Sequence, residues 1–306
     1  MKKIVVIGSS NVDLIMKMEH IPGKGETVTD ADFFQVYGGK GANQAVAAAR
    51  AGGNVAFVTC VGEDAYTPQM VRSYKNENID TRFVFQESGI ASGYALIMIG
   101  GDGDNCISVA PGANYLLTPQ KIDEALPVID EAAMIVMQYE IPEETIKYVI
   151  DLANLKMIPV LWNCAPARAF DSLYIPKINI LVLNEVEAGF LAGIPVENEA
   201  DAENAAQKLV DSGVEKVIIT LGSKGAFVVT KTEKVMIPAF KVDAVDTTAA
   251  GDTFCGTFAV AQAEEKSLKD SLLFASAAAA ISVTRMGAQP SAPTRDEIDK
   301  FLAENS

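Results

Sequence analysis

Beyond Thr118 the chain alternates between short apolar segments and longer segments of mixed character. The apolar segments are rich in β-branched residues, and the segments between them have the composition of amphipathic helices. Strands of this kind are buried on both faces, so the alternation predicts a doubly wound α/β fold, a mostly parallel sheet with helices on both faces. Strands are expected at residues 134–138, 157–162, 178–183, 217–221, 226–230 and 239–245, and helices at 143–154 and 201–212.

The N-terminal part fits this pattern only in places. Strands at residues 3–8 and 55–61 and a helix at 42–51 belong to the same fold. Residues 12–36 look extended and irregular instead, and two apolar runs near residue 100 flank a glycine-rich hairpin turn. We therefore expect one α/β domain over residues 1–306, with a small β-sheet lid formed by about residues 12–37 and 90–114.

Charge and hydropathy exclude several classes of protein. Forty acidic residues against 25 basic ones give a formal net charge of −15, which argues against a nucleic-acid partner. The apolar runs fall far short of the roughly 20 residues that a membrane helix needs. The first strand is also too short for the apolar core of a signal peptide, so we expect a cytoplasmic protein.

Cysteine and histidine usage narrows the chemistry. The cysteines are scattered and form no CxxC pair, so buried free thiols are expected rather than disulfides or a zinc site: Cys60, Cys106, Cys164 and Cys255. The only histidine, His20, lies in a predicted turn without the partners of a catalytic triad or metal site. Acid–base chemistry therefore falls to carboxylates.

The most informative motif is Asp-Thr-Thr-Ala-Ala-Gly-Asp-Thr-Phe at residues 246–254, followed by a helix-compatible run. A helix that starts here would point unpaired backbone amides outward, and such a terminus attracts anions. We interpret Asp252 as a catalytic base. The amides of Ala249, Ala250 and Gly251 are interpreted as an anion hole for a developing phosphoryl charge.

A second motif, Gly-Gly-Lys-Gly-Ala-Asn-Gln at residues 38–44, precedes a helix that should begin at Ala42 or Asn43. Its glycines permit close approach of a ligand, and Lys40 and Asn43 could bind a polyhydroxyl compound. The motif matches neither a Walker A loop nor a dinucleotide fingerprint. A plain glycine-rich turn is an equally good interpretation of this segment alone.

Polar residues at expected strand ends are further candidates. Asn11 and Asp13 follow the first strand and Glu140 follows another, at the sheet edge where α/β proteins bind ligands. An Asx turn explains Asp13 equally well. Asn184 and Glu187 have the spacing of a capping box, which is the favoured interpretation, although both could help to hold a hydrated Mg²⁺.

Two loops have simple interpretations as turns. Residues 220–225, Thr-Leu-Gly-Ser-Lys-Gly, join two expected strands, and a hairpin turn is favoured over a nucleotide-binding loop. Asp102 and Asp104 also lie in a turn, because an EF-hand would need more ligands and a later glutamate.

Taken together, these segments resemble the PfkB family of carbohydrate kinases. Matching segments run in order through essentially the whole chain: residues 38–45, 163–167, 184–187, 220–225, 246–254 and 281–291. Several separate motifs in one order are more specific than any single motif. The resemblance implies a doubly wound α/β domain with a β lid that can also form a dimer contact.

The resemblance also implies roles for individual residues. The sugar would be contacted by Asn11, Asp13, Gly39, Lys40, Gly41, Asn43, Glu140 and the base Asp252. ATP would lie among Asn184, Thr220, Leu221, Gly222, Ser223, Lys224, Gly225, Gly251 and Ser276. A monovalent cation would be held by Asp246, Thr248, Ser282, Arg285, Gly287 and Ser291, with Arg285 and Gly287 contributing carbonyl oxygens because a guanidinium has no lone pair.

The expected reaction is ATP-dependent phosphorylation of the O5 primary hydroxyl of a pentose, D-ribose, as a step of carbohydrate catabolism. Mg²⁺ is expected with ATP, near Glu187, and K⁺ as an activating ion, in a homodimer formed through the lid. Alternatives are a related kinase for deoxyribose, a hexose or a nucleoside, and a sugar-binding relative that has lost catalysis. A nicotinamide enzyme is opposed by the missing dinucleotide fingerprint after Ile7.

Overall fold

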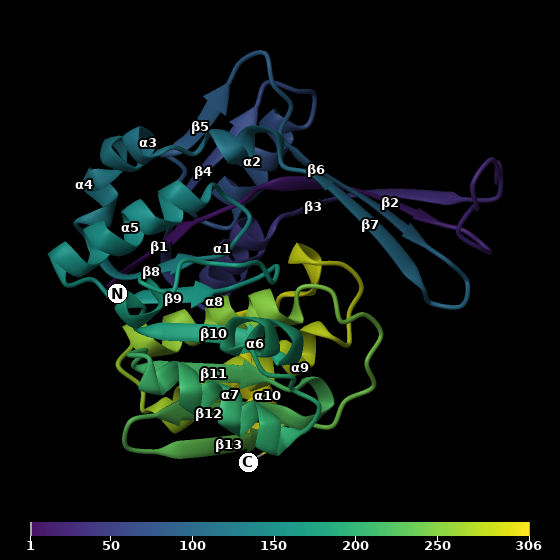
Figure 1. Ribbon diagram of the computed structural model, residues 1–306. Coiled ribbons are helices and arrows are strands. Elements are labelled where there is room, and N and C mark those ends of the chain that lie inside the picture. Colours follow the sequence, from purple (N-terminus) through teal and green to yellow (C-terminus); the bar gives the residue numbers. More distant parts are fainter. Residues whose placement is uncertain (1, 306) are drawn as a thin grey trace.

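The computed structural model describes residues 2–305, so Met1 and Ser306 of the expected domain lie outside the described residues. Figure 1 shows a layered body of sheet and helices from which a smaller sheet projects. Within residues 2–305, none of the helices has both the length and the apolar character that crossing a bilayer requires.

The main sheet has nine strands among the described residues, and its inner strands are parallel. Antiparallel pairing is confined to one end of the described sheet, where β12 pairs with β11 and with the edge strand β13. In spatial order the strands are β13 (Lys234–Pro238), β12 (Gly225–Thr230), β11 (Lys216–Thr220), β10 (Ile180–Asn184), β9 (Val160–Asn163), β8 (Ala132–Met137), β1 (Lys3–Ile7), β4 (Asn54–Gly62) and β5 (Val84–Glu87).

Helices cover both faces of this sheet, as the apolar strands predict. Alternate residues of β1 show why: Val5 and Ile7 pack into one core, and Ile4 and Val6 into the other. The first core is covered by α3 (Pro119–Glu124), α4 (Leu126–Ile129), α5 (Glu143–Lys156), α6 (Glu185–Ala192) and α7 (Glu199–Asp211). The second is covered by α1 (Lys40–Arg50), α2 (Thr67–Asn76), α8 (Ala250–Ala263), α9 (Leu268–Ser282) and α10 (Arg295–Glu304).

The projecting sheet has four strands within residues 2–305 (Figure 1). Its order is β3 (Asp32–Gly38), β2 (Asn11–Lys17), β6 (Gly93–Ile99) and β7 (Asn105–Ala110). These strands confirm that the two extended N-terminal regions form a separate small sheet. Short 3₁₀ helices occur at Gly112–Leu116, Ile175–Lys177, Gly222–Lys224 and Gln289–Ser291.

The prediction of a strand at residues 239–245 is wrong. The last strand ends at Pro238, and the following residues are irregular. Apolar side chains of this segment, including Phe240 and Val242, line a cavity instead of a sheet face. An apolar run that lines a ligand cavity has the same composition as a buried strand, which is why the pattern misled.

Smaller corrections follow from backbone geometry. Met157 has a left-handed φ of 56° and ends α5, so β9 begins only at Val160. Gly39, with φ 87°, is the N-cap of α1, which therefore starts at Lys40 rather than at Ala42 or Asn43. Cys106 lies on the exposed strand β7, while the other three thiols are buried as expected.

The strand order places a ligand crevice at the centre of the sheet. After β1 the chain first builds one side of the sheet, with β4 and β5, and later the other side, from β8 onward. At such a switch point the carboxyl ends of neighbouring strands leave room for a ligand. The segments that follow β1, β8, β9, β10 and β11 therefore converge on one edge of the sheet.

Candidate active site

Two cavities meet at the N-terminus of α8. The larger has a volume of about 450 Å³ and the smaller about 210 Å³. Both are lined by Thr220, Thr247, Ala250 and Gly251. The N-terminus of α8 therefore lies where a ligand in one cavity would reach a ligand in the other.

The start of α8 has the geometry of an anion site. Ala249 is the N-cap with a left-handed φ of 58°, and its side chain cannot accept a hydrogen bond from the first turn. The first-turn amides of a helix have no intrahelical acceptor, and the helix dipole adds a partial positive charge there. Of the three amides of the expected anion hole, Ala250 N–H donates to the Thr247 carbonyl oxygen at 3.3 Å, whereas those of Ala249 and Gly251 have no backbone acceptor within residues 2–305. The anion hole stays a prediction.

Asp252 lies in the first turn of α8 and is 5% exposed. Its Oδ2 accepts a hydrogen bond from Asn43 Nδ2 and its Oδ1 from Gln44 Nε2, each at 2.9 Å. Burial raises the pKa of Asp252, and Lys40, Asn43 and Gln44 oppose that rise. A buried carboxylate with an elevated pKa, lining the smaller cavity next to the residues that line both, is suited to accept a proton.

The N-terminus of α1 packs against the segment after β1 through glycine. A Cβ on Gly41 would lie 2.5 Å from the Ser9 backbone nitrogen, so only glycine permits this approach. Glu140 fixes the other side, because its Oε2 accepts from the Lys40 backbone N–H at 3.1 Å and from Ser9 Oγ at 2.5 Å. The expected sugar residues of three separate segments are thereby brought together.

Two buried oxygen atoms in this region lack a partner. Asp13 Oδ1 and Asn43 Oδ1 accept no hydrogen bond within the described residues. Buried polar atoms are nearly always satisfied, so such a pair marks a place for donors from a ligand. Burial, followed by the charges of Glu140 and Asp252, raises the pKa of Asp13 to about 7. These acceptors fit the hydroxyl groups of a sugar.

Asn11 also lies at this edge and is 4% exposed. Its Oδ1 accepts from Asn114 Nδ2 at 2.7 Å, and Asn114 Oδ1 accepts from the Ser10 backbone N–H at 2.8 Å. These bonds fix the Asn11 amide so that its NH₂ group is directed away from Asn114. Sequence reasoning missed Asn114, since nothing in its local pattern distinguishes it from other loop asparagines.

Asn184 and Glu187 form the capping box that their spacing predicted. The Glu187 backbone N–H donates to Asn184 Oδ1 at 2.8 Å, and Glu187 Oε2 accepts from the Asn184 backbone N–H at 2.9 Å. Both residues also line the smaller cavity with Lys40 and Asp252. Burial raises the pKa of Glu187. A desolvated carboxylate oxygen beside this cavity fits a hydrated Mg²⁺, a cation that prefers oxygen ligands.

The expected ATP residues divide into two groups. Thr220, Gly222, Ser223, Gly225 and Ser276 line the larger cavity together with apolar residues such as Phe240 and Phe254. Leu221 is buried in the core instead. Lys224 does not belong to the cavity lining among the described residues and ends the 3₁₀ turn that joins β11 to β12. A mostly apolar cavity beside the N-terminus of a helix suits a nucleotide.

Asp246 is contacted by two of the other expected cation residues, Thr248 and Gly287. Its Oδ1 accepts from the backbone N–H and the hydroxyl of Thr248 at 2.9 and 2.6 Å, and its Oδ2 from the Gly287 backbone N–H at 2.9 Å. Although burial acts in the opposite direction, these bonds hold the pKa of Asp246 below its usual range. Carbonyl, hydroxyl and carboxylate oxygens of this kind are ligands that hard cations prefer, so the residues fit an alkali ion.

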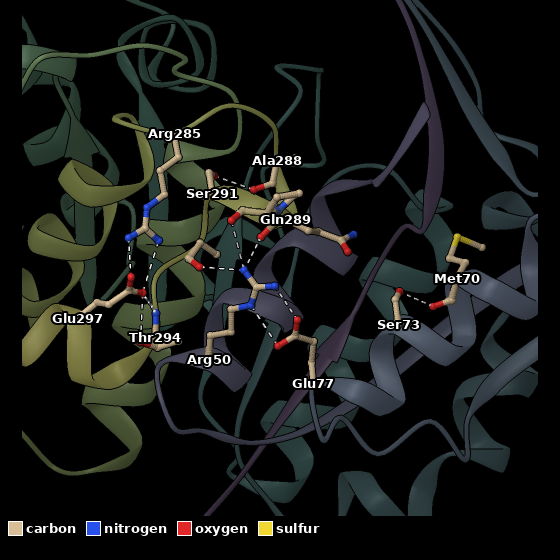
Figure 2. Close-up of polar contacts among 12 residues, drawn as sticks. Arg50, Met70, Ser73, Glu77, Arg285, Ala288, Gln289, Ser291, Thr294 and Glu297 are labelled. Carbon is tan, nitrogen blue, oxygen red and sulfur yellow. Dashed lines mark hydrogen bonds and ion pairs between the residues drawn. The ribbon is translucent and has the colours of Figure 1, made fainter. Parts of the chain in front are cut away.

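Figure 2 shows the hydrogen bonds and ion pairs that fix residues 285–297, the segment that includes Gly287. Arg50, at the end of α1, donates to the carbonyl oxygens of Gln289 and Ala292 at 2.8 and 2.9 Å and pairs with Glu77. The Arg285 side chain pairs with Glu297 at 2.6 Å, which leaves only its carbonyl group for the expected cation role. Ser291 Oγ donates to Ala288 O, and Ser282 Oγ to Ala279 O, so both hydroxyl oxygens retain lone pairs.

The known proteins that this chain is similar to include carbohydrate kinases. The model of the pfkB family of carbohydrate kinases matches residues 1–295. A ribokinase from Haemophilus influenzae is 41% identical, with 98% of both chains covered, and a deoxyribokinase from Salmonella typhi is 39% identical, with 99% of both covered. The structure of an Arabidopsis thaliana ribokinase complexed with ribose and ATP is 32% identical with a TM-score of 0.93, and 98% of each chain is covered.

Proposed function

Because the chain belongs to the pfkB family of carbohydrate kinases, we propose that it transfers the γ-phosphoryl group of ATP to O5 of D-ribose, giving ribose 5-phosphate and ADP. One observation carries the proposal. A buried carboxylate, Asp252, lies at the N-terminus of a helix where two cavities meet, beside the unpartnered acceptors of Asp13 and Asn43.

Asp252 accepts the proton of the ribose O5 hydroxyl as O5 attacks the γ-phosphorus. The bond from that phosphorus to the β–γ bridging oxygen breaks, and its electron pair leaves with ADP. The outward amides at the start of α8 stabilise the negative charge of the transferring group. Mg²⁺, held with ATP near Glu187, supplies charge neutralisation on the β- and γ-phosphates when bound.

The experiment that tests the function is phosphate transfer from ATP across a panel of ribose, deoxyribose, hexoses and nucleosides, with the position of phosphate read by NMR. Ribose phosphorylated at O5 is expected to have the largest kcat/KM. A larger value for deoxyribose would favour the second candidate, for which the deoxyribokinase relative is the specific observation. Absence of transfer to any sugar would reject kinase function.

Asp13 makes sugar binding dependent on pH. An ionised Asp13 accepts hydrogen bonds from sugar hydroxyls, and its pKa is raised to about 7, first by burial and then by Glu140 and Asp252. Affinity for ribose is therefore complete above this pH and declines as pH falls through it, by up to about tenfold per pH unit for one titrating group. Calorimetric titration with ribose on both sides of pH 7 measures this, and Asp13→Asn should abolish the decline at the cost of weaker binding.

A monovalent cation at Asp246 is part of the proposal. Bound K⁺ would order the loop from Asp246 to Ala249 that precedes α8, and so hold the amides toward the phosphates. Turnover should rise on the order of 5-fold or more when K⁺ replaces a large organic cation, which is the usual range for coupling between two sites. Steady-state assays at constant ionic strength measure the effect, and equal turnover in both buffers would contradict it.

We further propose that the projecting sheet acts as a lid and joins two copies of the chain. Apolar side chains are exposed on both of its faces: Met16, Phe33 and Leu96 on one, and Phe34, Ile107 and Val109 on the other. The second face also carries Asp13. One face can therefore close on the sugar while the other packs against a partner copy. A monomer at all concentrations in sedimentation experiments would reject the dimer.

The cytoplasm is the proposed compartment, since the reaction consumes ATP. The buried free thiols Cys60, Cys164 and Cys255 agree with a reducing environment. Cell fractionation would test this, and recovery of the protein outside the cytoplasm would reject it.

A further inference from the structure

A chain of side-chain amides reaches Asp252 from the protein interior, and of its members only Asn163 lines a cavity, the smaller one. Gln44 Nε2 donates to Asp252 Oδ1 at 2.9 Å and to Asn163 Oδ1 at 3.1 Å. Gln138 Nε2 donates to Gln44 Oε1 at 2.7 Å. Gln44 and Gln138 are both fully buried. The amides connect α8 to α1 and to the ends of β8 and β9.

The orientation of each amide in this chain is dictated by its neighbour. An ionised carboxylate only accepts, so the NH₂ group of Gln44 has to face Asp252. Its carbonyl oxygen then faces Gln138, which has to donate. Asn163 Nδ2 donates to the Val182 carbonyl at 3.1 Å, and its oxygen therefore faces Gln44. Gln44 cannot rotate without breaking several buried hydrogen bonds.

The two oxygens of Asp252 are held differently. Oδ1 accepts from Gln44, which lies outside both cavity linings and has no exposed surface. Oδ2 accepts from Asn43, which is 8% exposed and whose own Oδ1 has no partner among residues 2–305. An arriving sugar can therefore replace or share the Asn43 bond, whereas the Gln44 bond stays in place.

We propose that Gln44 is a positioning residue that holds Asp252 Oδ1 and thereby reserves Oδ2 for the proton of the acceptor hydroxyl. This inference rests on the proposed kinase function. The proton passes from O5 to Oδ2 while O5 forms its bond to the γ-phosphorus and the β–γ bridging oxygen leaves with ADP. Gln44 gains and loses no proton in the step.

The pKa of Asp252 depends on the charged and titratable groups around it, and a change in this pKa is how the removal of Gln44 would be detected. They come from every element packed against it: Lys40 of α1, Asp13 of β2, Glu140 after β8, Glu187 of α6 and Cys255 of α8. The Gln44 bond favours the ionised form and so lowers the pKa of Asp252. Loss of this bond raises that pKa, which moves the acidic limb of the kcat–pH profile to higher pH.

The test variant is Gln44→Met, which keeps the side-chain length and removes the amide. We expect kcat to fall roughly 10- to 100-fold, the effect of losing one hydrogen bond to a charged group. KM for ribose should change less than about threefold, because Gln44 touches no ligand. The matched control is Gln262→Met on α8, which removes a hydrogen bond to Ser271 Oγ far from the site. The control should change neither kcat nor the pH profile.

Gln44→Glu separates positioning from packing. An ionised glutamate beside Asp252 repels its charge, so the acidic limb should move upward in the order wild type, Gln44→Met, Gln44→Glu. Gln138→Met, which touches Gln44 but not Asp252, should give a smaller shift in the same direction. A structural role alone predicts lower stability without this order. Unchanged limbs in all three variants would overturn the inference.

A readout without turnover keeps this result independent of the proposed function. The pKa of Asp252 can be measured by NMR titration of protein with ¹³C-labelled aspartate carboxyls, with Asp252→Asn identifying the signal. A higher pKa in Gln44→Met supports the inference, and an unchanged one rejects it. If no sugar is phosphorylated, the kinase proposal fails on its own evidence. If Gln44→Met does not fold, the titration is done with Gln138→Met instead. A higher pKa of Asp252 in that variant supports the inference, and an unchanged pKa rejects it.

Discussion

Asp252→Asn should lower kcat by roughly 10³-fold, within the range expected for loss of a general base. Asparagine has nearly the same shape as aspartate and cannot accept the O5 proton. The substitution leaves Asp13, Glu140 and the N-terminus of α1 in place, so the dissociation constant for ribose should change by no more than about threefold. Steady-state kinetics with ribose and MgATP, and calorimetry with ribose alone, measure the two quantities.

The same substitution, which lowers activity, should raise the stability of the folded protein. Burial raises the pKa of Asp252, so the folded state disfavours the ionised form at neutral pH. The cost of that charge is full above the folded-state pKa and disappears below the unfolded-state pKa. Asp252→Asn should therefore melt at a higher temperature than the wild type at pH 7, with a smaller difference in acid. Retained turnover would reject Asp252 as the base, whatever the melting temperature.

Gly251→Ala should also separate stability from activity. A methyl group at Gly251 would meet no protein atom within 4 Å, and alanine is the better helix former by about 0.5–1 kcal/mol. The variant should therefore fold at least as well as the wild type. Gly251 lines both cavities, however, so the methyl group would occupy the space proposed for the transferring phosphate.

We expect turnover of Gly251→Ala to fall by about 100-fold, since a displacement near 1 Å at the reacting centre has an effect of that order. Thermal melting and steady-state kinetics on one preparation measure both properties. Ribose affinity serves as the internal control and should not change, because all the expected sugar residues except Asp252 belong to other segments. Full activity would show that the phosphate does not pass over Gly251.

The sequence predicted most of the fold and, within the candidate site, the capping box, because these features depend on residues that are close together in the chain. The β-branched runs that became β8, β10 and β11 were visible as buried strands, and Asn184 and Glu187 as a capping box. The sequence predicted a helix after Ala-Ala-Gly, with its helix-compatible run beginning at Phe254, whereas α8 begins earlier, at Ala250.

The amide chain of Gln44, Gln138 and Asn163 could not be predicted. Its members are separated by up to 119 positions, and each bond depends on where the strands end. One signal was present: Gln138 is a polar residue directly after the apolar strand Ala132–Met137. The prediction of a strand at residues 239–245 failed for a different reason. Apolar composition does not reveal whether a segment forms a buried strand or lines a cavity.

Ala249 has a methyl side chain at a position where most helices have a hydroxyl, amide or carboxylate. Within the described residues no side chain therefore caps the first turn of α8, whose Ala250 N–H has a backbone acceptor before the helix, the Thr247 carbonyl oxygen. In the proposed reaction, the phosphate of the nucleotide would accept hydrogen bonds from this turn, so that the substrate would complete the helix while it is bound. Catalysis and local helix stability would then depend on the same hydrogen bonds, which would be lost when the product leaves.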